Sequence, residues 1–207
     1  MTEPEPSPVD TSPVDTGPVE RKRTELTDAR AMRAYAHPLR LRLVMLLRRY
    51  GPHTATQAAK ALDDNVPNCS FHLRQLAKYG LVERVEGSDN RERPWRAATN
   101  VTSWNDTGDD PERRAAADQL TGSIVNRYFE IARTWLQNRH RESGEWRNVT
   151  GISDQTLHVT VDEMAEVIQR IEDVMAPYIA RHDDPSLRPA DSRAITVVQL
   201  AMPWETP

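Results

Sequence analysis

Apolar residues in the first half of the chain recur at helical spacing in several short runs. The first run predicts a helix that begins at Thr24 or Thr27 and ends at Ala36. We expect a second helix to begin at His37-Pro38, because proline fits the first helical turn, where the backbone N–H has no helical partner. Gly51-Pro52 is expected to end this helix. The chain therefore predicts two helices joined by a short junction.

A polar turn separates the next two predicted helices. The third covers residues 56–62, and Asn65 is suited to cap a fourth helix with Pro67 in its first turn. Tyr79-Gly80 is expected to end the fourth helix, because glycine readily adopts the left-handed conformation that often follows a helix. The two helices and the turn between them predict a helix-turn-helix unit.

The apolar period changes after the fourth helix. Residues 81–85 predict a strand, residues 87–90 a turn, and residues 94–97 a returning strand. Helices, a tight turn, a further helix and a hairpin follow one another in the order of a winged helix-turn-helix domain. We therefore assign a recognition helix to about 66–79 and a wing to about 81–98.

A long helix is predicted in the second half of the chain. Asp110-Pro111-Glu112 supplies an N-cap, a first-turn proline and an acid at the positive helix end, and the helix extends to about residue 141. Its apolar face is wider than a surface helix needs, so the rest of the domain or a second subunit must cover it. Two adjacent stripes form this face: Leu120, Ile124, Tyr128, Ile131 and Trp135, and beside them Val125, Phe129, Ala132 and Leu136.

The last part of the chain predicts a strand, a helix and a strand. Apolar and polar residues alternate over 156–161, which indicates a half-buried strand. Thr160 and Glu163 form a capping box that opens a helix, and the apolar run 195–202 fits a final strand. The expected fold class is therefore α+β and mainly helical: a winged helix-turn-helix domain, a long helix and a small strand–helix–strand C-terminal domain.

Composition divides the chain into three parts. Residues 1–23 are acidic and rich in proline, with a near-repeat of Ser-Pro-Val-Asp-Thr, and such a segment cannot bury enough apolar surface to fold. We read it as a disordered tail. Residues 24–101 are assigned to the DNA-binding domain, and residues 102–207 to a C-terminal domain for dimerisation or effector binding.

The same composition bears on the cellular compartment. No run approaches the roughly 20 apolar residues that cross a bilayer, and the acidic, proline-rich start differs from a secretory signal. Cys69 is the only cysteine, so neither an intrachain disulfide nor a cysteine cluster for zinc is available. We expect a cytoplasmic protein with no membrane partner.

The net charge of −4 conceals an uneven distribution. Residues 1–20 carry five acids and no Lys or Arg, residues 21–98 carry 16 Lys+Arg and 8 Asp+Glu, and residues 99–207 carry 11 and 18. Only the local field matters at a contact surface, so the basic middle segment favours a polyanionic partner. A further hypothesis is that the acidic tail folds onto this basic face.

Ser70, His72, Leu73 and Leu76 of the predicted recognition helix follow a Ser-x-His-Leu-x-x-Leu pattern, and Gly80-Leu81-Val82 comes after it. This pattern resembles the recognition helix of the arsenic-repressor-like (ArsR) family of winged-helix regulators. The junction Ala34-x-x-His37-Pro38-Leu39-Arg40 resembles that family's junction between the first two helices, and the wing over 91–96 resembles a subgroup with an extra C-terminal domain. The resemblance covers residues 27–98 and implies a homodimeric repressor that binds double-stranded DNA.

Candidate DNA contacts follow from the way a recognition helix enters the major groove. Asn68 and Gln75 are suited to adenine and Arg74 to guanine, while Phe71 can touch a thymine methyl group. The alternative for each is a solvated surface residue. The remaining candidates are Lys78 on the same face, Ser70 and Thr56 for phosphates, and the wing residues Arg91, Arg93 and Arg96 for phosphates or the minor groove.

Two residues invite other interpretations. His72 could bind a metal or sense pH, but the family position suggests packing and hydrogen bonding near the DNA backbone. Cys69 falls on the inward face of its helix and is expected to be a small buried residue. His140, His158 and His182 are far apart in the sequence and no cysteine pair exists, so we expect no metal site and no cofactor.

Aromatic residues of the C-terminal domain leave two alternatives open. Tyr128, Trp135, Trp146 and Tyr178 could line a pocket for a small organic effector. They could equally belong to the core or to a dimer interface, together with Leu120, Ile124 and Ile131.

The sequence favours one function over two others. A homodimeric repressor would place two recognition helices in successive major grooves and block a promoter. An enzyme within 102–207 would need catalytic or phosphate-binding motifs, and none is present. A protein-interaction module with a winged-helix fold would not need Arg74, Lys78, Arg91 and Arg93 together.

Overall fold

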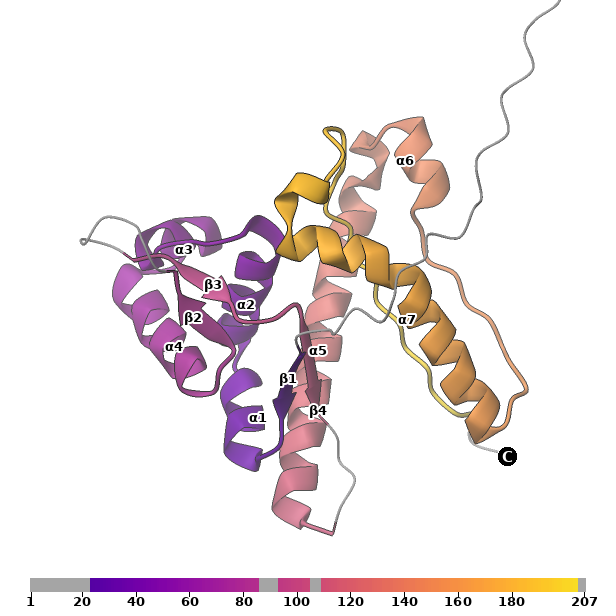
Figure 1. The fold of residues 1–207 in the computed structure, drawn as a ribbon, viewed down its shortest axis with the longest axis horizontal. Coiled ribbons are helices and arrows are strands. Elements are labelled where there is room, and N and C mark those ends of the chain that lie inside the picture. Colours follow the sequence, from indigo (N-terminus) through magenta and orange to yellow (C-terminus); the bar gives the residue numbers. More distant parts are fainter. Residues whose placement is uncertain (1–22, 86–92, 105–108, 205–207) are drawn as a thin grey trace, which may run out of the picture.

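The computed structural model describes residues 23–85, 93–104 and 109–204. In the first half of the chain, short helices pack around a compact core and the strands lie beside them (Figure 1). The elements there are β1 (Arg23–Leu26), α1 (Ala29–Tyr35), α2 (Pro38–Tyr50), α3 (Ala55–Leu62), α4 (Val66–Lys78), β2 (Val82–Arg84), β3 (Trp95–Ala97) and β4 (Val101–Trp104).

Side-chain caps fix where these helices begin. The backbone N–H of Ala31 donates to the Asp28 carboxylate at 2.9 Å, so α1 starts after Asp28, and the predicted start at Thr24 is wrong. Thr54 caps α3 in a capping box. Asn65 caps α4 as predicted, accepting from the backbone N–H of Asn68 at 2.8 Å. The other helix positions expected from the sequence in this half are confirmed to within a few residues.

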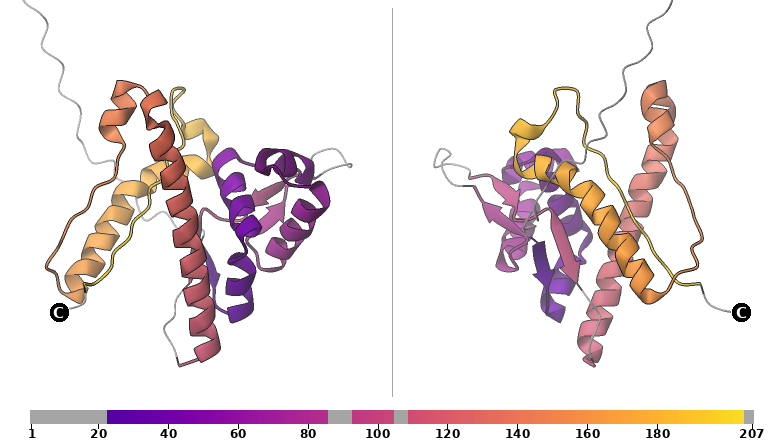
Figure 2. Two further views of the ribbon diagram at one scale, coloured as in Figure 1. Left: turned by 180° about the vertical axis from the view of Figure 1, so that it is seen from behind. Right: turned by 45° about the vertical axis from the view of Figure 1, so that its right-hand side comes forward.

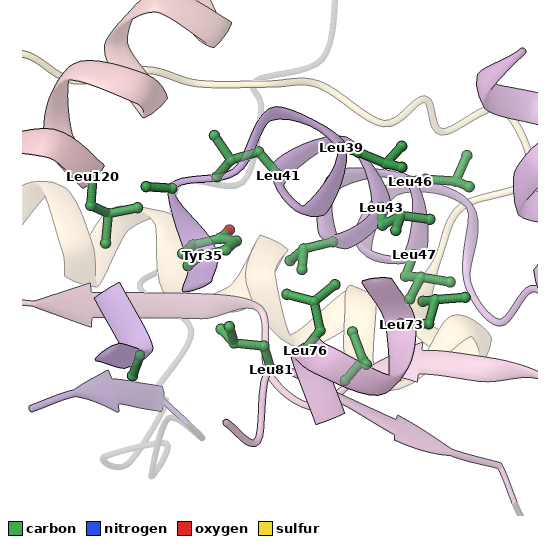
Figure 3. Close-up of a cluster of buried hydrophobic side chains, with 14 of the residues drawn as sticks. Tyr35, Leu39, Leu41, Leu43, Leu46, Leu47, Leu73, Leu76, Leu81 and Leu120 are labelled. Atoms are coloured by element: carbon green, nitrogen blue, oxygen red, sulfur yellow. The ribbon is translucent and has the colours of Figure 1, made fainter. Parts of the chain in front are cut away.

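The core lies between α2 and α4. Leu43 and Leu47 of α2 meet Leu73 and Leu76 of α4, and all four side chains are fully buried (Figure 3). The predicted inward position of Cys69 is confirmed, because its side chain is buried in the same cluster. Burial of a Leu side chain stabilises a fold by about 1.5–3 kcal/mol, so this contact orients α4 against the rest of the domain.

The predicted hairpin is present and extends to a third segment. Strands β2 and β3 pair antiparallel, with Val82 opposite Ala97. His53, just before α3, adds an isolated bridge to Trp95, with N–H to carbonyl distances of 2.9 and 2.8 Å. The predicted turn at 87–90 falls outside the described residues.

A second strand pair was not predicted. β1 and β4 lie parallel, with Arg23 opposite Val101. Arg48 of α2 ties this pair to the helices, donating from Nε to the carbonyl of Thr99 at 3.0 Å and from its terminal nitrogen to the Thr102 hydroxyl at 2.7 Å. The Trp104 indole of β4 donates to the Thr121 hydroxyl of α5 at 3.0 Å, so β4 joins α2 to the first half of α5.

The second half of the chain is formed by helices and extended segments. The long helix extends close to the predicted end, and the capping box at Thr160 is confirmed (Figures 1 and 2). No helix among the described residues is long and apolar enough to span a membrane. The elements are α5 (Pro111–Asn138), η1 (Arg139–Arg141), α6 (Gly144–Val149), α7 (Val161–Asp183) and η2 (Pro185–Leu187).

The predicted strand–helix–strand unit is not formed. Residues 151–160 and 192–204 are extended but carry no strand pairing, although α7 lies between them in the sequence as expected. A strand needs a second backbone beside it to satisfy its N–H and C=O groups. Among the described residues, no backbone hydrogen bond joins the two segments. Apolar and polar residues do alternate in the first segment, but neither segment has a strand of the same chain beside it with which to pair.

Replacement of one core leucine tests the assigned contact between α2 and α4. We expect Leu73→Ala to lower the free energy of unfolding by about 2–5 kcal/mol, because it leaves a cavity between the two helices. Lys78→Ala on the exposed face of the same helix is the control and should change it by no more than about 0.5 kcal/mol. Urea denaturation followed by circular dichroism measures both, and equal effects would contradict the assignment.

Candidate nucleic-acid interface

Helix α4 has one anchored face and one exposed face. Phe71, Arg74 and Lys78 project to solvent along a single line, because they are spaced three and four residues apart. Val66 and Pro67 extend the exposed surface to the start of the helix. Since the opposite face is fixed in the core, the exposed side chains are presented on a rigid support.

The turn before α4 is held by polar contacts. Asp63 ends α3 with a left-handed backbone, at φ 52°. The next residue, Asp64, accepts from the backbone N–H of Asn65 at 2.8 Å and from the Asn68 side-chain amide at 2.9 Å. The Asn68 hydrogen bond is the main reason that the pKa of Asp64 lies below its usual value. The Asn68 amide therefore already has one acceptor inside the turn.

The remaining candidates on α3 and α4 differ in accessibility. Thr56 is exposed in the first turn of α3. Ser70 is partly buried and its hydroxyl accepts from the Arg74 guanidinium at 3.1 Å, which steadies Arg74 along the helix surface. Gln75 is half-buried at the edge of the exposed line.

His72 lies inside the domain, with 6 % of its surface exposed. Its ring packs on that of His37, with centroids 4.4 Å apart, and its other neighbour is the edge of Phe71 at 5.1 Å. Burial, the neighbouring His37 and Arg40 lower the pKa of His72 below its usual value. His72 therefore supports the exposed Phe71 from beneath.

The junction residue His37 has its own structural role. Its Nδ1 accepts from the backbone N–H of Leu39 at 3.2 Å and so caps α2. Burial, and then the charge of Arg40, lower the pKa of His37. The sequence marked His37-Pro38 as a helix start, but nothing in it indicated that the two imidazoles stack.

The base of the wing is organised by Arg84, which the sequence did not single out. Its guanidinium lies 3.8 Å from the centroid of the buried Trp95 ring and donates to the carbonyl of Arg93. Burial, and then the positive charges of Arg74 and Arg93, lower the pKa of Arg84. The structure thus brings three guanidinium groups from α4 and the wing near one another.

The other wing arginines differ in their surroundings. Arg96 forms an exposed ion pair with Glu83 on the neighbouring strand, with 2.7 Å between nitrogen and oxygen. Arg93 is exposed, and Arg91 falls outside the described residues. A surface ion pair such as Arg96–Glu83 contributes little to stability, so its arginine can exchange partners at low cost.

The residues predicted for a dimer interface or effector pocket are spread over three helices. Leu120 is buried against the core, and the next four positions of its stripe are half-buried along α5: Ile124, Tyr128, Ile131 and Trp135. Trp146 of α6 lies beneath Arg193, and the exposed Tyr178 of α7 lies beneath Arg181, each at 4.9 Å. No ring contact found among the described residues joins these two to α5.

Metal-binding side chains do not cluster in the part of the chain that the structure describes. Within residues 23–85, 93–104 and 109–204, no group of three or more His, Cys, Asp or Glu side chains could hold a metal ion.

Comparison with known proteins identifies the segment that contains α4. The helix-turn-helix domain family matches residues 35–85, from the end of α1 to just beyond β2. Curated proteins give no match. A solution structure from Mycobacterium bovis, the homodimeric winged helix-turn-helix DNA-binding domain of a possible ArsR-family transcriptional regulator, is 20 % identical, with a TM-score of 0.31, and the match covers 56 % of this chain and 85 % of that one. The helix-turn-helix match suggests a DNA-binding transcriptional regulator.

The stacked histidines predict that stability depends on pH. Both folded pKa values lie below the usual 6.5, so the unfolded chain binds more protons at mildly acidic pH. The stabilising contribution is therefore complete above about pH 6.5 and is lost as the pH falls below it. We expect the urea midpoint to be lower at pH 5.5 than at pH 7.5, with a smaller drop in the variant His37→Gln/His72→Gln. His140→Gln, at an exposed position, is the control, and an unchanged drop in the double variant would contradict the assignment.

Proposed function

We propose that the chain is a sequence-specific DNA-binding transcriptional regulator that inserts α4 into the major groove of double-stranded DNA. One observation carries the proposal: Phe71, Arg74 and Lys78 are exposed along α4, whose opposite face is buried in the core, and the wing that carries Arg84 and Arg93 packs beside this helix. An α-helix fits the major groove, and the adjacent positive charges match the phosphates on its rim.

Base readout is assigned to the exposed and half-exposed residues of α4. Arg74 is suited to guanine, and Gln75 to adenine. Phe71, 48 % exposed and supported by His72, is suited to a thymine methyl group. Asn68 remains a candidate for adenine, although its contact with Asp64 would have to be shared or exchanged.

Phosphate contacts are assigned to the margins of the same surface. Thr56 at the start of α3 and Ser70 on α4 are suited to donate hydroxyl hydrogen bonds. Lys78, Arg91, Arg93 and Arg96 supply positive charge, and His72 acts indirectly by supporting Phe71.

A homodimeric repressor is the form of regulation that we propose. Two copies of α4 would enter successive major grooves about 34 Å apart on a pseudo-palindromic site, and the bound dimer would occlude a promoter. In this scheme residues 24–101 bind DNA in the cytoplasm, and residues 102–207 join the two subunits. A small organic effector between the C-terminal helices would then alter the spacing of the two copies of α4.

Two other functions have less support. An enzyme in the C-terminal part would need catalytic motifs that the sequence lacks, and helix-turn-helix regulators are typically not enzymes. A protein-interaction module would leave the clustering of Arg74, Arg84 and Arg93 without a purpose. Binding of DNA by the intact protein separates this last alternative from the proposal.

Fluorescence anisotropy tests the proposal directly. Duplexes enriched from a random pool by the full-length protein should bind more tightly than a scrambled duplex of the same composition. The logarithm of the affinity should fall linearly with the logarithm of salt concentration, because phosphate contacts release counterions. Equal, weak binding to all duplexes, or no binding at low salt, would contradict the proposal and favour the interaction module.

Variants then separate base contacts from phosphate contacts. We expect Arg74→Ala to weaken binding to the enriched duplex by about tenfold or more and to relax the preference at one base pair. Arg93→Ala should weaken binding to all duplexes similarly and reduce the salt slope by about one. Lys60→Ala, at an exposed position of α3, is the control and should leave affinity nearly unchanged.

A further inference from the structure

Two extended segments of the C-terminal half carry apolar side chains that nothing covers. Both run beside α7 toward its N-terminal end (Figures 1 and 2). An unpaired backbone with apolar side chains readily pairs with another strand. The exposed large apolar residues of the two segments are Ile152, Leu157, Val159, Ile195, Val197, Val198, Leu200, Met202 and Trp204.

The second segment is apolar on both of its faces. In an extended chain alternate residues point to opposite sides, so Ile195 and Val197 face one way and Val198 and Leu200 the other. A strand of this kind is typical of a sheet that is covered on both faces. Helix α7 can cover one face, so a second layer must come from elsewhere.

The two long helices also lack cover. None of the described side chains of α7 is buried, and the buried residues of α5 are confined to its start, at Ala116, Ala117 and Leu120. Farther along α5, Phe129 and Leu136 are exposed. Within one chain α7 packs against η2, whereas α5 packs against α1, α2 and η1, so the apolar faces of α5 and α7 are not packed extensively against each other.

The uncovered elements have opposite net charge. Residues 161–183, which form α7, carry six acidic and two basic side chains, a net −4. Residues 123–149, the second half of α5 with η1 and α6, carry five basic and three acidic side chains, a net +2. The opposite net charges favour contact between α7 and residues 123–149, whereas contact between two copies of α7 would bring like charges together.

We propose that residues 152–204 form an arm that docks on a second copy of this chain. In the dimer, α7 of one subunit covers the second half of α5 of its partner, and the two extended segments become strands by pairing across the interface. A two-fold axis makes both contacts twice without any further component, because each subunit offers both the arm and the surface that receives it. The inference deepens the homodimer of the proposed function and assigns its interface.

Hydrogen exchange of the wild-type protein, without DNA, tests the arm. Sedimentation equilibrium should give a mass of two chains and define the dissociation constant. Amides in residues 152–160 and 194–202 should exchange slowly well above that concentration and quickly well below it, while amides of α2 and α4 stay protected at both. Protection of the two segments that does not change with dilution would mean that they pair within one chain, and a monomeric protein would likewise overturn the proposal.

A matched pair of variants locates the interface. Leu200→Glu places a charge where we expect a buried side chain and should raise the dimer dissociation constant about tenfold or more. Gln119→Glu adds the same charge at an exposed position in the first half of α5, outside the arm and the surface that receives it, and should have a much smaller effect. Unchanged far-ultraviolet circular dichroism shows that both variants fold, and an unchanged dissociation constant in Leu200→Glu would exclude the arm from the interface.

DNA binding provides the separate readout for the underlying function. If wild-type protein binds DNA but the two segments exchange quickly at every concentration, the proposed arm fails and the regulator stands. If the arm is protected only in the dimer but no duplex binds, the arm stands and the DNA-binding function fails.

Discussion

The packing of α4 against α2 is the contact on which the rest of the helix-turn-helix region depends. Leu73 and Leu76 are fully buried with leucines of α2, and Cys69 is buried in the same cluster. A helix fixed on one side cannot rotate without exposing these residues, so the line through Phe71 and Arg74 has a defined direction. The apolar core thereby determines which side chains of α4 face outward.

Polar contacts refine this orientation. The stacked His37 and His72 rings connect the N-terminus of α2 to the inner side of α4, and burial and the charge of Arg40 lower the pKa of both imidazoles. Arg84 of β2 rests on Trp95 of β3 and donates to the carbonyl of Arg93, so it joins the two wing strands. The exposed charges of α4 and the wing are thus positioned by buried groups, which limits the entropy that these side chains would lose on binding a partner.

The C-terminal half follows the opposite pattern. Its apolar faces are long but uncovered, and the described chain connects it to the helix-turn-helix region mainly through the packing of α5 on α1 and through β4, whose Trp104 donates to Thr121 of α5. Arg48 bridges this connection from α2 to Thr99 and Thr102. A change in the packing on α5 can therefore affect the position of α2 and, through the leucine core, the position of α4.

The sequence by itself determined the helices of both halves except α6, the caps at Asn65 and Thr160, the hairpin and the exposed line of α4, because helical periodicity and capping depend on residues within a few positions of each other. Only the tertiary structure decided that β1 pairs with β4, that His72 lies inside and that Arg84 lies on Trp95. It also decided that residues 195–202 form no strand within one chain. These outcomes depend on groups that are far apart in the sequence. A local pattern of residues identifies an apolar face, but it does not identify the segment that packs against that face.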